Sequence, residues 1–274
     1  KLEGVYLYKN QLKSLDLTKN TDVRYINVGD NQLKGLNTSN QPNLSLIIAN
    51  NNEISSVDFA NNTRLTQVML AHNQLNSIDV TKAGILSWFK VDNNNLSELN
   101  VQSNPYLYWL ECDSNRIEKL DLSKNTYVQW IAAQNNLLKG LNLTANKGLQ
   151  GLFLQNNMME QDSINSIIEQ LQDVSGVEIH ANNEAWARQL NISYMPGTEG
   201  ANVAAAQAKG WIVTALYETS GVDHVDGDNA VVKSVYYNLN GVELGQQVTE
   251  DGIYIVKEMH RNGSVTARKV LVVK

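Results

Sequence analysis

The 274-residue sequence predicts a mostly β solenoid, a fold in which short units repeat along the chain and stack on one another. Three observations predict it. An asparagine recurs every 21 residues through the first half of the chain, apolar residues keep fixed offsets from it, and a 21-residue unit leaves no room for a helix. One unit cannot bury an apolar face alone, so the units are expected to share one continuous core.

The repeat keeps its register without an insertion or a deletion. Its asparagines are Asn10, Asn31, Asn52, Asn73, Asn94, Asn115, Asn136 and Asn157. Apolar residues stand eight, five and three positions before each asparagine and two positions after it. The resulting pattern, L-x-x-L-x-L-x-x-N-x-L, is the leucine-rich repeat signature. The sequence therefore predicts a leucine-rich repeat solenoid of about eight repeats over residues 1–157.

The L-x-L part of each repeat is expected to be a short strand whose apolar side chains face the core, because successive residues point to opposite faces. The asparagine amide both donates and accepts, so these side chains should satisfy backbone groups in the turns. A weaker copy of the motif, such as "LDLTKN" at 15–20, predicts a second extended segment in each repeat. Cys112 falls in a core column and is expected to be a small buried hydrophobe.

The positions six, four and two before each asparagine are expected to face solvent on the concave side of the sheet. Three consecutive tryptophans share one of these columns, and adjacent strands about 4.8 Å apart would align their indoles in a stripe roughly 10 Å long. Exposed apolar patches with polar rims mark interaction sites, and tryptophan is enriched among binding hot spots. The predicted ligand-binding residues are Trp88, Trp109, Trp130, Lys90, Asp92, Glu111 and Asp113.

Two alternatives remain open for this stripe. Cross-strand aromatic neighbours stabilise a sheet, so the tryptophans could form a purely structural ladder. A further N-terminal segment or a neighbouring molecule could also cover them.

The repeat register ends after Asn157, and residues 158–218 predict an α/β cap over the open end of the core. Isoleucines and a leucine at helical spacing predict a helix over 162–174, with Asp162 or Ser163 as its N-cap. A strand over 176–183, a short helix that ends at Gly210 and a strand over 211–216 are expected to follow. Trp186 and Trp211 are expected to pack inside this cap.

Residues 219–230, "TSGVDHVDGDNA", are polar and glycine-rich and predict a linker. Their aspartates do not have the spacing of a calcium-binding EF-hand loop. Short alternating segments over 231–274, with Asn-Gly pairs at 240–241 and 262–263, predict a small all-β module resembling a β-sandwich.

The composition argues against several functions. The chain has 22 basic and 28 acidic residues, which gives no electrostatic reason to expect nucleic acid or an anionic membrane as partner. A single cysteine excludes an intrachain disulfide framework and any multi-cysteine metal site. No apolar run approaches the roughly 20 residues of a membrane span. The first residues already belong to the repeat and contain no signal peptide.

An enzyme is not expected. The four histidines lack metal-ligand spacing, and no nucleophile elbow or phosphate loop occurs. Asp92, Glu111 and Asp113 could supply the carboxylate pair of a glycosidase, but a flat open sheet does not exclude water and would not sustain raised pKa values. No cofactor and no metal are expected.

Three stretches resemble a known group of proteins. Residues 120–157, "LDLSKNTYVQWIAAQNNLLKGLNLTANKGLQGLFLQNN", resemble the 21-residue leucine-rich repeats of Bacteroidetes surface proteins, which are distantly internalin-like. The segment "MPGTEG...AKGW" is similar to the end cap of that group, with "YMPG" where such caps often carry Asn-Pro-Gly. The tail from Val235 resembles the C-terminal sorting domain of type IX secretion systems. The resemblance implies an exported protein, secreted or displayed at the cell surface.

The sequence thus predicts a non-catalytic binding module that recognises an extracellular protein or peptide, host-derived partners included, through the concave face. A glycan bound by the same tryptophan stripe is one alternative. A structural or adhesive surface spacer is another. Binding led by the carboxylates should weaken as ionic strength rises, whereas sugar stacking should barely change.

Overall fold

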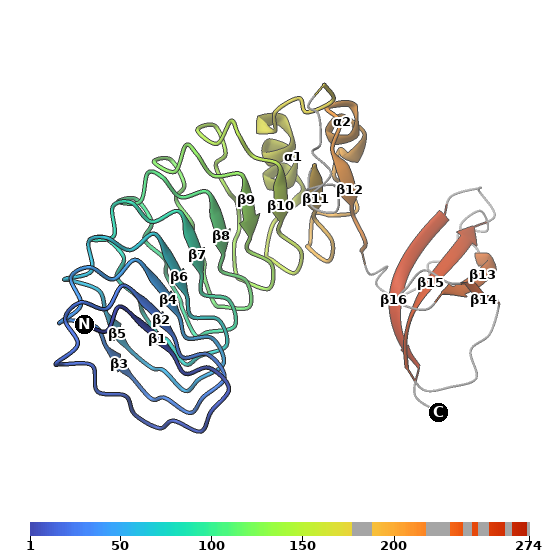
Figure 1. Ribbon diagram of the computed structural model, residues 1–274. Coiled ribbons are helices and arrows are strands. Elements are labelled where there is room, and N and C mark those ends of the chain that lie inside the picture. Colours follow the sequence, from blue (N-terminus) through green and yellow to red (C-terminus); the bar gives the residue numbers. More distant parts are fainter. Residues whose placement is uncertain (177–187, 218–230, 238–242, 246–251, 261–264, 273–274) are drawn as a thin grey trace. The chain divides into compact units, whose positions relative to one another are not determined.

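The computed structural model describes residues 1–176, 188–217, 231–237, 243–245, 252–260 and 265–272. The chain forms two compact units, Lys1–Thr214 and Ala215–Lys274. The first unit is a stack of narrow turns that share one long sheet, which confirms the predicted mostly β repeat solenoid (Figure 1).

The main sheet of the first unit has ten strands, all joined by parallel pairing. Its first eight strands hold three residues each and lie one repeat apart. They are β1 (Gly4–Tyr6), β2 (Tyr25–Asn27), β4 (Leu46–Ile48), β6 (Gln67–Met69), β7 (Trp88–Lys90), β8 (Trp109–Glu111), β9 (Trp130–Ala132) and β10 (Gly151–Phe153). Equivalent residues pair directly, as Leu110 does with Ile131, so each sequence column becomes a straight row across the sheet.

The other half of each repeat returns the chain to the next strand, as a parallel ladder requires. In the part of the chain that the structure describes, this side carries one pair of two-residue strands, β3 (Leu36–Asn37) and β5 (Val57–Asp58).

The predicted inward columns form the core. In the fifth repeat, Leu86, Phe89, Val91 and Leu96 are fully buried. Cys112 is also buried and unbridged, as predicted, and burial raises the pKa of its thiol far above the ordinary value. These side chains from successive repeats make the continuous apolar interior that no single repeat could form.

A helix and two further strands follow the last repeat. Helix α1 (Gln161–Gln170) buries Ile164, Ile167 and Ile168, as the helical spacing predicts. Its start differs from the prediction. The N-cap residue is Glu160, which makes no side-chain capping bond. Because the helix begins at Gln161, Asp162 lies inside its first turn. An acidic side chain there still favours the helix, because the N-terminal turn carries partial positive charge.

The strands β11 (Gln189–Asn191) and β12 (Ile212–Thr214) continue the main sheet beyond β10 in parallel. Between them, helix α2 (Val203–Ala208) has Asn202 as its N-cap, and the Asn202 side chain accepts a bond from the backbone N–H of Ala205. Gly210 follows with a φ of +82°, and Trp211 is buried with its indole N–H on the carbonyl of Gln172. Trp186 and all but the first residue of the expected strand over 176–183 lie outside the described residues.

The second unit contains an antiparallel sheet of four strands in the order β14 (Glu243–Gly245), β13 (Val231–Tyr237), β15 (Gly252–His260) and β16 (Val265–Val272). The predicted linker at 219–230 and both Asn-Gly pairs lie outside the described residues. Among the described residues, no helix has the length and apolar character needed to span a membrane.

Candidate functional site

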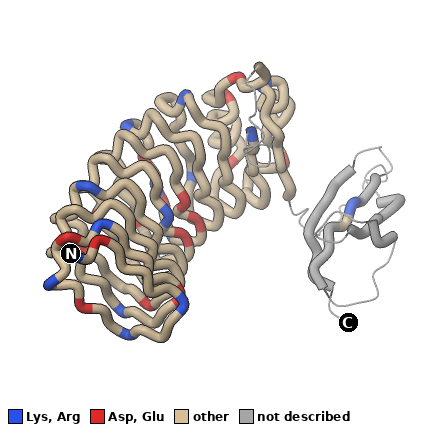
Figure 2. The backbone as a smooth tube through the Cα atoms, viewed as in Figure 1, with Lys and Arg blue, Asp and Glu red and all other residues tan. Residues whose placement is uncertain are grey.

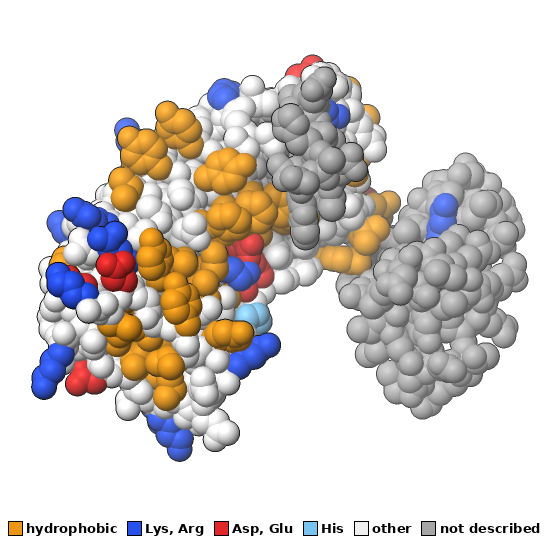
Figure 3. All heavy atoms as spheres, viewed as in Figure 1, with side chains coloured by type: hydrophobic (Ala, Val, Ile, Leu, Met, Phe, Trp, Pro, Cys, Tyr) orange, Lys and Arg blue, Asp and Glu red, His pale blue; other side chains and the backbone are white. Residues whose placement is uncertain are grey.

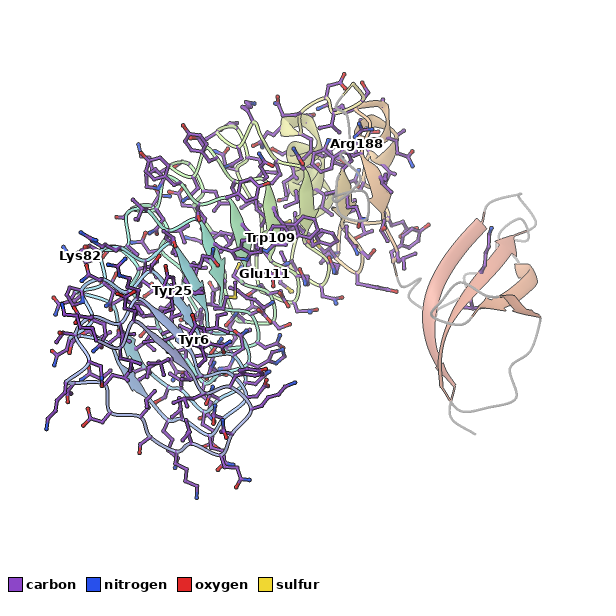
Figure 4. The ribbon with its side chains drawn as sticks, in the orientation of Figure 1. Tyr6, Tyr25, Lys82, Trp109, Glu111 and Arg188 are labelled. Atoms are coloured by element: carbon purple, nitrogen blue, oxygen red, sulfur yellow. The ribbon has the colours of Figure 1, made fainter. Side chains whose placement is uncertain are left out.

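The predicted site residues lie on one surface, called here the sheet face: the side of the main sheet that points away from the core. Trp88, Trp109 and Trp130 begin the neighbouring strands β7, β8 and β9. Figure 4 labels Trp109 and Glu111 near the middle of this face, with Tyr6 and Tyr25 toward its N-terminal end. Successive residues of a strand point to opposite faces, so Trp109 and Glu111 point outward because Leu110 between them points into the core.

The tryptophans form a stack, as predicted, and a fourth ring extends it. The ring centroids of Trp88 and Trp109 are 5.1 Å apart with 25° between the ring planes. Trp109 and Trp130 are 4.7 Å apart at 12°, and Trp130 and Phe153 are 4.7 Å apart at 39°. These spacings fall in the range of favourable aromatic pairs. The aromatic stack, as these four residues are called below, therefore crosses the four strands β7 to β10.

Phe153 was not predicted as part of the stack because that residue belongs to a different column from the tryptophans. The structure explains how it reaches them. Gly151 stands in the tryptophan column, and a Cβ atom there would lie 2.2 Å from Trp130 Cε3. The missing side chain leaves room for the Trp130 indole to lie over β10 and meet Phe153.

The stack is less exposed than the sequence suggests. Trp130 lies between Trp109 and Phe153 and is only 8% exposed, so its expected solvent-facing position is wrong. Trp88 and Trp109 are partly exposed. Each ring covers the next, which leaves the Trp88 and Trp109 end accessible and makes Trp130 mainly a packing residue.

A charged cluster adjoins the stack and consists of Lys90, Asp92, Glu111 and Asp113. Glu111 joins the two features, since its Oε1 accepts a 2.7 Å bond from Trp109 Nε1 and its Oε2 accepts from Lys90 Nζ. Lys90 Nζ also lies 3.0 Å from Asp92 Oδ1. Burial lowers the pKa of Lys90, but its bonds to Glu111 and Asp92 outweigh that effect and raise it. Figure 2 shows this group of opposite charges on an otherwise weakly charged stretch of the strands.

Asp92 was expected at the exposed rim of the tryptophan stripe. It is instead buried, with only 5% of its surface exposed. Its Oδ2 accepts a 2.9 Å bond from Asn93 Nδ2 and lies 3.8 Å from His72 Nε2. His72 was therefore missed as a neighbour of the cluster. His72 directly precedes Asn73, one of the asparagines that recur every 21 residues and are called the ladder asparagines below. The residues directly before these asparagines all have a φ between 53° and 57°. They are Lys9, Asp30, Asn51, His72, Asn93, Ser114, Asn135 and Asn156.

Asp113 is the carboxyl group that Lys90 does not neutralise. None of the ion pairs within the described part of the chain includes it. Burial and the negative charge of Asp92 raise the pKa of Asp113 to about 6, and the hydrogen bond from Ser114 Oγ offsets this only in part. At neutral pH the cluster thus holds three carboxylates against one ammonium. Figure 3 shows acidic and basic side chains next to hydrophobic ones on this face.

Other exposed aromatics were also missed. Tyr6, Tyr8 and Tyr25 lie on the sheet face of the first two repeats, with Tyr6 65% exposed. Tyr106 and Tyr127 stack at 5.9 Å in the turns that precede β8 and β9. The 21-residue spacing of Ile85, Tyr106 and Tyr127 was the available signal, but that column lies outside the strand positions on which the prediction concentrated.

The site has no metal-binding arrangement in the portion that the structure describes, where no three His, Cys, Asp or Glu side chains converge suitably. The partly exposed aromatic rings can contact apolar or planar groups, and the carboxyl group of Asp113 can bind a cationic group.

No protein-family model and no curated protein matches this sequence. Solved structures do. The functional domain of InlJ from Listeria monocytogenes has a TM-score of 0.59 and 16% identity, over 98% of this chain and 81% of that one. A leucine-rich repeat protein of Leptospira interrogans has a TM-score of 0.64 and 20% identity, over 77% of this chain and 54% of that one.

The plant peptide hormone receptor RGFR1, solved in complex with RGF2, has a TM-score of 0.57 and 16% identity, over 79% of this chain and 40% of that one. This chain therefore spans about half or less of the Leptospira and plant proteins. At these identities the likeness concerns the fold. The chain has the fold of leucine-rich repeat proteins, internalins among them.

Proposed function

We propose that this protein is a non-catalytic binding module, secreted or displayed at the cell surface, that recognises a protein or peptide partner through the sheet face. The observation that carries the proposal is the aromatic stack with one accessible end beside a charged cluster of net negative charge. Both features are built on parallel strands of a continuous sheet, so they are preformed, and a preformed surface reduces the ordering cost of association.

The solved structures support this class of function. The RGFR1 structure contains RGF2, so a related repeat fold accommodates a peptide in that protein. Fold likeness at this identity does not carry a partner from one protein to the other, and the proposal for this chain rests on its own residues. The proposed partners include extracellular proteins or peptides of a host.

Export is supported by the sequence resemblance to Bacteroidetes surface proteins and, in the tail, to type IX sorting domains. We propose that residues 158–218 act as the cap of the solenoid and residues 231–274 as a sorting-type module. The four-stranded antiparallel sheet of the second unit is compatible with that role.

The test is a binding screen of the purified chain on arrays of extracellular matrix proteins and of glycans. A Trp88→Ala/Trp109→Ala variant removes the accessible end of the stack and leaves the buried Trp130 in place. A Tyr106→Ala/Tyr127→Ala variant removes an equally aromatic surface elsewhere and serves as the matched control. Circular dichroism verifies that both variants fold.

We expect protein or peptide signals that the tryptophan variant loses and the tyrosine variant keeps. Signals that survive in the tryptophan variant would contradict the proposal. Glycan signals alone, lost in the tryptophan variant, would favour the sugar-binding alternative, which stacked indole faces also suit. No signal in either array would leave a structural or adhesive spacer as the better description.

A further inference from the structure

We propose that the partner is an extended polypeptide segment that presents a lysine or arginine side chain to Asp113 and an apolar side chain to the exposed end of the aromatic stack. This inference rests on the proposed function and specifies the chemistry of its partner. Three features of the sheet face argue for it.

The first feature is the negative charge of the Asp113 carboxylate, which forms no ion pair among the described residues. Lys90 is already paired with Glu111 and Asp92, although it lies near enough to Asp113 to lower the pKa of that carboxyl slightly. The sheet positions beside Asp113 in the next repeat are Ala132 and Gln134, which supply no positive charge either. An ammonium or guanidinium group at Asp113 would form a charge-assisted hydrogen bond, which is stronger than a neutral one.

The second feature is a shortage of hydrogen-bond donors in the same row. Asp92, Asp113, Gln134 and Gln155 stand in one column, two residues before successive ladder asparagines. The Oε1 atoms of Gln134 and Gln155 are buried and have no hydrogen-bond partner among the described residues. Lysine brings three donors and arginine five. Because these two oxygens are shielded from solvent, such a side chain would reach them only after the amides rotate.

The third feature is the arrangement of the two subsites. Trp109 begins β8 and Asp113 follows two residues after the strand ends at Glu111, so the two are four residues apart in one repeat. That separation corresponds to about 13 Å in an extended chain. A peptide lying along the strands would thus place its apolar and basic side chains about four residues apart, and residues at that spacing point to the same side of an extended segment.

The groups around Asp113 also predict how binding responds to pH. Lys90 and Asp92 face it from the β7 repeat, Glu111 from β8, and His72 contacts Asp92 from the β6 repeat. Because the pKa of Asp113 is raised to about 6, this carboxyl is neutral at lower pH and attracts a cation less. Affinity should therefore fall as pH falls from about 7.5 to about 5.

The experiment selects random linear peptides, displayed on phage, against the full chain at about pH 7.5 and low salt. Synthetic copies of the enriched peptides are then titrated against the wild type and two variants. Asp113→Asn removes the proposed contact, and other repeats already carry Asn50 or Gln134 in that column. Asp58→Asn removes the same charge on the opposite side of the solenoid, where Asn37 and Asn100 occupy the column.

We expect a basic residue about four positions from an apolar one in the enriched peptides. Their affinity for Asp113→Asn should be about tenfold or more weaker than for the wild type at pH 7.5. The affinity of the wild type should fall by about as much at pH 5. The affinity for Asp58→Asn should hardly change.

Two other results would overturn the inference in distinguishable ways. Enriched peptides without a basic residue, lost in Trp88→Ala/Trp109→Ala but kept in Asp113→Asn, would refute the role of Asp113 and leave the proposed function standing. A folded chain that enriches no peptide at all would refute both the inference and peptide recognition by the sheet face.

Discussion

The asparagine ladder shows at the scale of single residues how the repeat holds its turns. Asn94 is 8% exposed, and its Nδ2 donates to the carbonyls of Leu70, Val91 and Asp92 at 3.0–3.1 Å. Its Oδ1 accepts from the backbone N–H of Leu75 at 2.9 Å. One side chain thus pairs four backbone groups from two neighbouring repeats, groups that would be costly to bury unpaired.

We expect Asn94→Ala to lower the free energy of unfolding by roughly 3 kcal/mol, because an unpaired buried polar group costs about 1–3 kcal/mol and several are affected. Asn76→Ala is the matched control. Asn76 is exposed and makes one long bond, to the carbonyl of Gln74, so its loss should cost under about 0.5 kcal/mol. Urea denaturation measures both, and equal destabilisation by the two changes would refute the ladder's role.

The residue before each ladder asparagine illustrates what the sequence hides at this scale. All eight adopt a left-handed conformation. Asparagine, aspartate and histidine are enriched in it, but Lys9 and Ser114 adopt it too. The neighbouring hydrogen bonds enforce the conformation in every repeat, so residue type alone could not identify it.

The aromatic stack is a property of elements, since each ring comes from a different strand. Parallel pairing in register brings the Trp88, Trp109 and Trp130 positions side by side, and Gly151 lets the last indole lean over β10. The consequence is a division of roles along the stack. The enclosed end packs the sheet, and the accessible end is available to a partner.

We expect Trp130→Ala to destabilise the protein by about 3 kcal/mol and Trp88→Ala by about 1 kcal/mol. The two changes remove the same atoms, so the difference isolates how much packing surrounds each ring. Thermal or urea unfolding gives the two values, and near-ultraviolet circular dichroism reports the loss of coupled indoles. A larger effect at Trp88 than at Trp130 would contradict this division of roles.

The first unit as a whole closes its own core at the C-terminal end. Strands β11 and β12 extend the sheet past the last repeat, and helix α1 buries three isoleucines there. Residues 1–217 should therefore contain everything needed for a folded solenoid, whereas residues 1–157 end with the core of the last repeat uncovered.

We expect a chain of residues 1–217 to unfold cooperatively, with the midpoint of the solenoid transition in the full-length protein. A chain of residues 1–157 should expose Leu152 and Leu154, which are now fully buried, and should aggregate or lose its transition. Circular dichroism melts and size-exclusion chromatography compare the three chains. An unfolded 1–217 chain would show that the second unit is needed for the fold of the first.

Much of this protein was accessible from the sequence because a fixed period leaves little freedom. A strand that repeats every 21 residues without insertions must stack in register, so the core columns, the row of tryptophans and the helix after the last repeat could all be predicted. The helix N-cap could not, because Asp162 and Ser163 carry the preferred capping side chains, whereas the helix begins after Glu160, which makes no side-chain capping bond.

The sequence by itself determined which residues share a row and which face of the sheet each row occupies, because both follow from the period and from strand alternation. The tertiary structure decided how far each side chain reaches into its neighbours. It buried Trp130 under adjacent rings, enclosed Asp92 and paired Lys90 with two carboxylates, and among the described residues it gave Asp113 no ion pair. Those outcomes depend on side-chain rotamers and on contacts between repeats, which differ from row to row although the backbone repeats.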